Sequence, residues 1–254
     1  MAHFTVLGSA AVVNDATHDY THFLLVGDED TPVLVDAGSN PLGKLQDLGI
    51  DDQALEDVIL THFHPDHVSG FPNMMMHMWL LGRKAPMRIY GLGHCIDRTE
   101  DVMTAFGWGE WPNFFPVGFH RVYEQFRAPV MENKDFRIIA WPVEHFVPTI
   151  GLRIENKHNG RVLAYTCDTS PTDSLFELAQ GADLLLHEAA AFKNEFGHST
   201  ARQAGELATE VGAKSLYLIH YQVWDVDPEP LVEEAQEVYD GPVVLCKDFD
   251  RIEL

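Results

Sequence analysis

The chain of 254 residues is 46% hydrophobic and 22% charged, which is typical of a globular protein and excludes a disordered chain, a collagen and a disulfide scaffold. Its 17 Lys and Arg against 39 Asp and Glu give a formal net charge of −22, so its surface should repel polyanions and anionic membranes. We therefore expect neither nucleic acid nor a membrane as a partner, and no apolar run approaches the ~20 residues of a membrane span. Residues 1–13 lack the basic region of a signal peptide, and the three cysteines have no close spacing, so a cytoplasmic location is expected.

Short apolar runs predict strands in the first half of the chain. These strands cover residues 4–7, 23–26, 33–35, 58–60 and 88–90, with a turn at residues 27–30. A helix is predicted from about residue 67 to residue 81, because Met74, Met75, Met78 and Leu81 recur at helical spacing.

The second half repeats this order of strands followed by helices. Strands are predicted at residues 136–143, 150–154, 162–165, 184–186, 216–219 and 243–246, with a hairpin turn at 158–160. A helix from Thr200 to Val211 begins with a capping box formed by Thr200 and Gln203. Another helix should begin at Asp227, with Pro228 as its first residue. Two such halves predict one α/β sandwich, in a single domain that covers residues 1–254.

An aromatic stretch at residues 106–126 fits neither pattern. Between its glycines and prolines stand Phe106, Trp108, Trp111, Phe114, Phe115 and Phe119. The stretch is either an irregular loop tucked into the core or an apolar lid, pocket wall or subunit contact. A subunit contact there would make the protein a homodimer.

The strongest chemical signal is the segment THFHPDH at residues 61–67, which directly follows the predicted strand at 58–60. Proline is excluded from a helix interior, so Pro65 predicts a tight, exposed loop. Such a loop can aim His62 and His64 at one point, and Asp66 and His67 at a second point nearby. Imidazole and carboxylate together suit Zn²⁺, Mn²⁺ or Fe.

Three further candidates follow predicted strands in the same way. His145, Asp168 and His220 each come just past the carboxyl end of an apolar strand, and such ends converge on ligand sites in α/β proteins. Each of them alone could be a structural residue. Together with the segment at 61–67 they supply seven ligands, enough for a binuclear centre of two divalent metal ions that share the carboxylate of Asp168.

The motif HFHPDH at residues 62–67, followed by His145, Asp168 and His220, resembles the metallo-β-lactamase superfamily over almost the whole chain. The resemblance implies a four-layer αββα sandwich with metals at the seam of two β-sheets. It implies one metal on His62, His64, His145 and Asp168, and another on Asp66, His67, Asp168 and His220. Asp36, in the segment LVDAG at 34–38, would either support a ligand or form an ordinary turn.

Two more segments are similar to one branch of that superfamily. HEAA at residues 187–190 and FGHST at 196–200 resemble segments of ribonuclease Z and related phosphodiesterases. In that branch the histidine that matches His198 assists phosphodiester cleavage, and the glutamate that matches Glu188 orients it. Ala190 stands where the branch usually has Thr. A role in helix capping is the alternative for the region around His198.

Two features distinguish the chain from ribonuclease Z itself. It has no long Gly-rich, basic insertion that could grip tRNA, and residues 91–140 are aromatic and acidic instead. We therefore expect a binuclear metal-dependent hydrolase whose substrate is a small molecule, namely a small or cyclic phosphodiester. Zn²⁺ is the expected ion, with Mn²⁺ or Fe as alternatives. Asp66 would accept the proton of the attacking water.

Three other functions remain open at this point. A lactonase or another ester hydrolase of the superfamily would share the metal ligands but would not need residues 197–200. A metal-binding or sensing protein without catalysis would not need all seven ligand positions filled. A di-iron redox protein would carry an electron-transfer domain, of which the sequence gives no sign.

Overall fold

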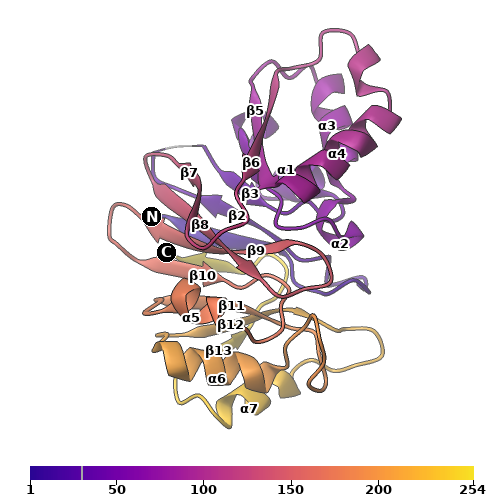
Figure 1. The fold of residues 1–254 in the computed structure, drawn as a ribbon. Helices are drawn as coiled ribbons and strands as arrows, with labels where there is room; N and C mark the ends of the chain where they lie inside the picture. Colours follow the sequence, from indigo (N-terminus) through magenta and orange to yellow (C-terminus); the bar gives the residue numbers. More distant parts are fainter. Residues whose placement is uncertain (30) are drawn as a thin grey trace.

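Two β-sheets lie face to face in the middle of the molecule, and helices cover the outer face of each sheet (Figure 1). The computed structural model describes residues 1–29 and 31–254. The last position of the turn predicted at residues 27–30 therefore lies outside the described residues.

The first sheet has seven strands in the order β14-β1-β2-β3-β4-β5-β6. Its strands are β1 (His3–Gly8), β2 (His22–Val26), β3 (Val33–Val35), β4 (Asp57–Ile59), β5 (Met87–Leu92), β6 (Val117–Val122) and β14 (Arg251–Glu253). Strands β3 to β6 run parallel, whereas β14, β1, β2 and β3 pair antiparallel. The helices on this side are α1 (Pro41–Asp47), α2 (Pro65–Val68), α3 (Phe71–Leu80) and α4 (Gly93–Ala105), with 3₁₀ turns η1 (Asp52–Ala54) and η2 (Trp108–Glu110).

The second sheet also has seven strands, in the order β13-β12-β11-β10-β9-β8-β7. Its strands are β7 (Ala128–Glu132), β8 (Phe136–Val143), β9 (Thr149–Asn156), β10 (Val162–Tyr165), β11 (Leu184–Ala189), β12 (Leu216–Tyr221) and β13 (Val243–Leu245). Strands β10 to β13 run parallel, and β7 to β10 pair antiparallel. The helices α5 (Ser174–Ala179), α6 (Ala201–Val211) and α7 (Pro230–Gln236) cover its outer face.

Three buried apolar clusters separate the four layers. Side chains alternate along each strand, so that Phe23 joins the cluster between the sheets while Leu24 joins the cluster under α1, α3 and α4. In the second sheet, Leu186 faces the first sheet and Leu185 packs under α5 and α6. These layers confirm the predicted α/β fold, a four-layer αββα sandwich.

The helix predicted at residues 67–81 is in fact two helices. The short helix α2 begins at Pro65, which occupies the first turn, where its missing N–H costs nothing. The chain then turns at Ser69 and Gly70, and α3 begins at Phe71. A Cβ on Gly70 would lie 2.4 Å from the carbonyl oxygen of Ser39, so only glycine allows this close approach.

The predicted start of helix α6 agrees with the structure, whereas that of α7 does not. Thr200 and Gln203 form the predicted capping box of α6. Helix α7 begins at Pro230 with Glu229 as its N-cap, so the start predicted with Asp227 as N-cap and Pro228 as first residue was wrong by two residues. The second proline of the sequence DPEP takes the first-turn position instead.

The aromatic stretch at 106–126 is more regular than predicted. It contains η2 and strand β6, and it follows helix α4, which the sequence pattern did not indicate. Trp108, Trp111, Phe114 and Phe119 pack, partly buried, against the core under α3 and α4. The stretch thus contributes several aromatic side chains to this core layer, while Phe106, Tyr123 and Phe126 remain exposed.

No helix in the described part of the chain is both long enough and apolar enough to cross a lipid bilayer.

Candidate metal centre

The segment at 61–67 leaves strand β4 and carries its four candidate ligands into the seam between the sheets. His62 and His64 lie in the predicted loop, but Asp66 and His67 lie in helix α2. The expectation of an exposed loop was also wrong, because His62 and His67 are fully buried and Asp66 is 4% exposed. Burial follows from the contact of α2 with the loop around Gly38, where a Cβ would lie 2.4 Å from the carbonyl oxygen of Asp66.

The three later candidates come from the second sheet and reach the same place. His145 follows β8 and Asp168 follows β10, as predicted. His220 lies within β12, as the extra residue of a β-bulge: Ile219 pairs with Glu188, and Tyr221 pairs with the next residue of β11. Its φ of 52° bends the strand there and turns the imidazole toward the seam.

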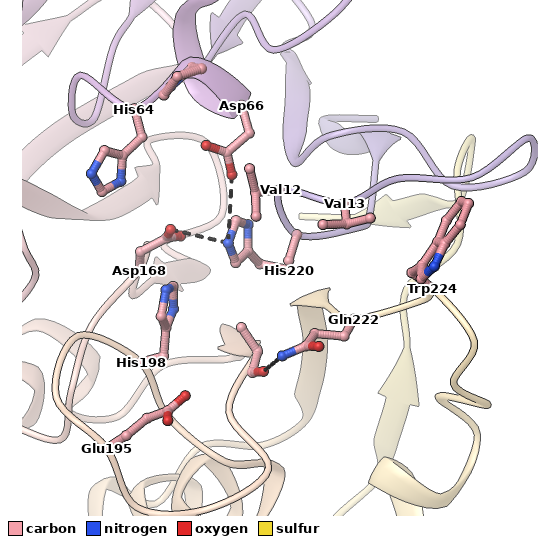
Figure 2. A pocket seen from close by; sticks show the side chains of 13 residues that line it. Val12, Val13, His64, Asp66, Asp168, Glu195, His198, His220, Gln222 and Trp224 are labelled. Carbon is pink, nitrogen blue, oxygen red and sulfur yellow. Dashed lines mark hydrogen bonds and ion pairs between the residues drawn. The ribbon is translucent and has the colours of Figure 1, made fainter.

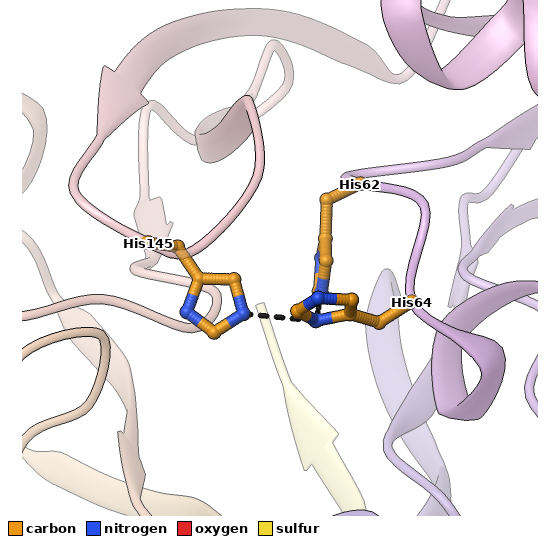
Figure 3. A group of neighbouring side chains, drawn as sticks. All are labelled: His62, His64 and His145. Carbon is orange, nitrogen blue, oxygen red and sulfur yellow. Dashed lines mark hydrogen bonds between the residues drawn. The ribbon is translucent and has the colours of Figure 1, made fainter.

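The seven side chains form two adjoining groups of donor atoms. His62, His64 and His145 form the first, with Nδ1 of His64 3.1 Å from Nε2 of His62 and 3.0 Å from Nε2 of His145 (Figure 3). Asp66, His67, Asp168 and His220 form the second, whose donor atoms all lie within 4.8 Å of one another. The structure thus brings together the seven side chains expected as ligands, and the groups differ from the two expected sets in that Asp168 belongs to the second group only. That these residues bind metal stays a prediction.

One carboxylate oxygen lies between the two groups. Oδ2 of Asp168 is 3.1 Å from Nε2 of His220 and 3.5 Å from Nε2 of His67 in the second group. The same oxygen is 3.8 Å from Nε2 of both His62 and His145 in the first group. Asp168 is therefore placed to be shared between two cations.

The outward nitrogens of the histidines are held by the scaffold. Nδ1 of His67 donates to Oδ2 of Asp36 at 2.8 Å, and Nδ1 of His145 donates to the carbonyl oxygen of Gly197 at 2.6 Å. Nδ1 of His220 lies 3.0 Å from the hydroxyl of Thr21. Each bond leaves Nε2 facing inward, the arrangement that orients imidazoles at metal sites. Asp36 thus supports a ligand, and its φ of 62° places its backbone in the left-handed region, but residues 36–38 form no regular turn.

The chemistry of these donors fits divalent cations. Nε2 of His67 and Oδ1 of Asp168 are buried and have no hydrogen-bond partner among the described residues, which is costly unless a ligand binds there. Burial lowers the pKa of His145 to about 4 and holds the pKa of His62 well below its ordinary value. Both rings are therefore neutral at pH 7, the form that binds a metal.

His198 and Glu188 form a pair beside these groups. Nδ1 of His198 donates to Oε1 of the fully buried Glu188 at 3.0 Å. Burial alone would lower the pKa of His198, but the hydrogen bond and charge of Glu188 outweigh it and raise the pKa to about 9. Donor atoms of His198, His145 and Asp168 lie within 4.8 Å of one another, so the pair adjoins the cluster.

A pocket of about 510 Å³ opens onto the cluster (Figure 2). Its floor carries His64, Asp66, Asp168, His198 and His220. Its walls come from residues 11–13, Ala190, Glu195, Gln222 and Trp224. No described residue of the aromatic stretch 106–126 lines it, so that stretch is not a wall of this pocket.

The sequence interpretation missed all of these wall residues except Ala190, namely residues 11–13, Glu195, Gln222 and Trp224. For Gln222 and Trp224 the available signal was their position just after strand β12, which carries the candidate ligand His220, because residues just past such strand ends face the same site. Thr21 was missed as well, since nothing in its neighbourhood distinguishes it from other threonines.

A family model described as Beta-lactamase superfamily domain matches residues 31–221 of this chain. The chain belongs to the beta-lactamase superfamily. As a superfamily member it has both the fold and the His and Asp cluster expected of a protein that binds divalent metal.

Other superfamily members resemble it along their whole length. Ribonuclease Z of Methanothermobacter thermautotrophicus is 26% identical, with 94% of this chain and 92% of the relative covered. The metallo-beta-lactamase fold protein YhfI from Bacillus subtilis superposes with a TM-score of 0.84 at 25% identity, covering 100% of both chains. Human tRNase Z, short form, superposes with a TM-score of 0.78 at 22% identity, covering 99% of this chain and 98% of the other.

These similarities confirm the predicted class, a metal-dependent hydrolase. They do not support the expectation that nucleic acid is excluded as a partner, because the similar protein from Methanothermobacter is named a ribonuclease. The predicted homodimer and the predicted single domain stay predictions.

Proposed function

We propose that this protein is a binuclear metal-dependent phosphodiesterase that hydrolyses small or cyclic phosphodiesters. The observation that carries the proposal is the His198–Glu188 pair at the edge of a seven-residue cluster of metal donors. Hydrolysis of a phosphodiester needs a nucleophile, neutralisation of the phosphoryl oxygens and a proton for the leaving oxygen. The cluster and the pair together offer groups for each of these tasks.

Seven residues would hold two divalent ions, Zn²⁺ in the first instance, with Mn²⁺ or Fe as alternatives. His62, His64 and His145 would hold one ion, and Asp66, His67 and His220 the other, with Asp168 shared. When bound, such ions lower the pKa of a water molecule toward 7 and neutralise phosphoryl oxygens. This charge is what allows a chain with a net charge of −22 to take an anionic substrate.

The chain's own residues handle the protons. Asp66 lies on the pocket floor with its carboxylate 4% exposed, where it can accept the proton of the attacking water. His198 donates through Nδ1 to Glu188, which leaves Nε2 to give a proton to the leaving oxygen. Glu188 keeps the ring in one orientation and favours its protonated form.

The pocket supports a small substrate. A volume of about 510 Å³ suits a molecule of the size of a nucleotide rather than a folded RNA, which would have to be gripped outside the pocket. The strongly negative net charge also disfavours long polyanions.

Cleavage of RNA is the second candidate, favoured by the relatives named ribonuclease Z. The two functions share the metals and the His198–Glu188 pair. They differ in how the substrate is held outside the pocket, so a substrate comparison separates them.

A panel assay on protein of known metal content tests the proposal. The substrates are bis-p-nitrophenyl phosphate, cyclic nucleotides, a lactone, a β-lactam and a precursor tRNA. We expect hydrolysis of the small phosphodiesters and a much lower kcat/KM for precursor tRNA. Opening of the lactone without cleavage of any phosphodiester would instead make the protein a lactonase.

A further inference from the structure

Trp224 lies at the mouth of the pocket, and its indole ring is exposed to solvent. The chain has five tryptophans, and the other four are packed. Trp79 and Trp111 stack on each other with ring centroids 4.9 Å apart, Trp108 packs edge-on against two phenylalanines, and Trp141 is 2% exposed. Trp224 is 63% exposed and contacts no other aromatic ring among the described residues.

An apolar wall extends from Trp224 toward the metal cluster. Val12 and Val13 line the same pocket although they are 58% and 52% exposed, and Figure 2 shows Val13 on the side of His220 that faces Trp224. The backbone N–H of Ala11 donates to the carbonyl oxygen of Tyr221 at 2.9 Å, which fixes this segment beside the end of β12. The wall therefore consists of two segments, residues 11–13 and 222–224, joined by this hydrogen bond.

Gln222 adds a hydrogen-bond acceptor of fixed direction to this wall. Its Nε2 donates to the carbonyl oxygen of Ala190 at 2.7 Å (Figure 2). A carbonyl oxygen cannot donate, so the amide has one orientation, and Oε1 stays available on the side away from Ala190. Oε1 of Gln222 and the exposed face of Trp224 together would suit a ligand with a planar ring that carries an N–H donor. The ring of the ligand would stack on Trp224, and its N–H would donate to Oε1.

The charge of the pocket limits the substrate further. None of the described residues that line it is a lysine or an arginine, and Glu195 adds a negative charge at the wall. Apart from the metal cluster and His198, no described lining residue can carry a positive charge that would attract a second phosphate. A strand of nucleic acid would bring several phosphates, whereas a mononucleotide brings one.

We propose that Trp224 and Gln222 form a nucleobase subsite, so that the substrate is a phosphodiester of a single nucleoside whose base stacks on Trp224. The inference rests on the proposed function and names its substrate class. Stacking of a base on an aromatic side chain changes affinity by about 5- to 150-fold on alanine substitution. An N–H group of the base donates to Oε1 of Gln222.

The first test compares two substrates that differ only in the base. These are 2′,3′-cyclic AMP and ribose 2′,3′-cyclic phosphate, each assayed with the metal-loaded protein. We expect kcat/KM to be about tenfold or more higher for the compound with the base, the scale of one stacked base. In Trp224→Ala this ratio should fall toward one, and Trp224→Phe should keep most of it. Phe126→Ala removes an aromatic side chain that is 55% exposed outside the pocket, and it should leave the ratio unchanged.

A second test does not depend on turnover. AMP should quench tryptophan fluorescence of the metal-loaded protein, and Trp224→Phe should abolish most of the quenching while calorimetry still detects binding. Purine riboside monophosphate, which lacks the exocyclic amine, should bind about fivefold more weakly, because it cannot donate to Gln222 in the same way.

The outcomes separate the two proposals. If neither cyclic phosphate nor bis-p-nitrophenyl phosphate is hydrolysed, the proposed function fails, while the AMP titration still tests the subsite. If both cyclic phosphates are hydrolysed at the same kcat/KM, or Trp224→Ala leaves their ratio unchanged, the subsite is refuted and the function stands. A higher kcat/KM for an RNA oligonucleotide than for cyclic AMP would also refute a single-nucleoside substrate.

Discussion

Oε1 of Glu188 accepts three hydrogen bonds of 3.0 Å, from Nδ1 of His198 and from the backbone N–H groups of Thr169 and Ser199. Oε2 accepts another from the backbone N–H of Ala190 at 2.8 Å. The carboxylate is therefore fixed before any substrate arrives, and the imidazole of His198 is fixed through it. A group held in this way is suited to deliver a proton without first reorganising.

Substitution of His198 should slow phosphodiester cleavage without loss of metal. In His198→Ala we expect kcat to fall by about 10²–10⁴-fold, the usual scale for a positioned acid. The loss should be smaller for bis-p-nitrophenyl phosphate, because p-nitrophenolate leaves without protonation, and larger for a nucleoside leaving group. Steady-state kinetics and elemental analysis of the same preparations check this. Equal losses for both leaving groups would contradict the role in proton transfer.

Substitution of Asp168 should release both metal ions, because its Oδ2 lies within 3.8 Å of histidines from both groups. His220→Ala should mainly weaken one site, since His220 belongs to the second group only. Elemental analysis after dialysis against a weak chelator should find less than one ion per chain in Asp168→Ala and about one in His220→Ala. The reverse order would show that Asp168 is not shared.

Substitution of Asp36 should weaken metal binding although Asp36 lies behind the ligands. Its carboxylate accepts from Nδ1 of His67 at 2.8 Å and from the backbone N–H of Thr61 at 2.8 Å. Loss of such a partner typically costs 10–100-fold in metal affinity. Chelator competition on Asp36→Asn should show this loss, and Asp101→Asn, on the exposed side of α4, should not. Unchanged affinity in Asp36→Asn would mean that the carboxylate only holds Thr61 in place.

The stability of the fold should fall in mild acid through His187. Burial lowers the pKa of this histidine from 6.5 to about 4, although its bond to the carbonyl oxygen of Glu188 opposes the shift. Between these two pH values the unfolded chain binds more protons than the folded chain, so the free energy of unfolding decreases as the pH falls.

Urea unfolding of wild type and His187→Asn at pH 7 and pH 4.5 measures this effect. We expect the wild type to lose about 2 kcal/mol more than the variant over this range, since each unit of pKa difference is worth ~1.4 kcal/mol. Asparagine keeps a donor near the position of Nδ1, which limits damage from the substitution itself. Equal losses in the two proteins would show that His187 is not buried as a neutral ring.

The strands and α6 were predictable because their signals are local. Alternation and short apolar runs located β8 to β12, and Thr200 with Gln203 located the start of α6. Helix α4 was missed although its buried residues Cys95, Ile96, Thr99 and Met103 recur at helical spacing, because no capping side chain marks its start. The break between α2 and α3 depends on the contact of Gly70 with Ser39, which only the folded chain reveals.

The candidate metal ligands could be predicted from the sequence, but the backbone conformations and contacts that hold them in place could not. His62, His64, His145 and Asp168 follow strand ends, and His220 lies next to the last residue of β12, so these positions along the strands bring them together. The positive φ values of Asp36, Cys167 and His220 could not be predicted from the sequence, because residues other than glycine rarely adopt such values. The position of Gln222 and Trp224 just after β12 indicated the site, but their place in one wall with residues 11–13 depends on the hydrogen bond between Ala11 and Tyr221, which only the folded chain shows.

The donors at the seam come from both halves of the chain, four after β4 in the first sheet and three after β8, β10 and in β12 in the second. Metal ions bound there would link one sheet to the other. Because only the folded chain offers this arrangement, a free metal concentration of 100 Kd would raise the free energy of unfolding by ~2.7 kcal/mol. The melting temperature would rise with it. Metal starvation would then lower the amount of the protein in the cell through unfolding and proteolysis, in addition to abolishing its activity.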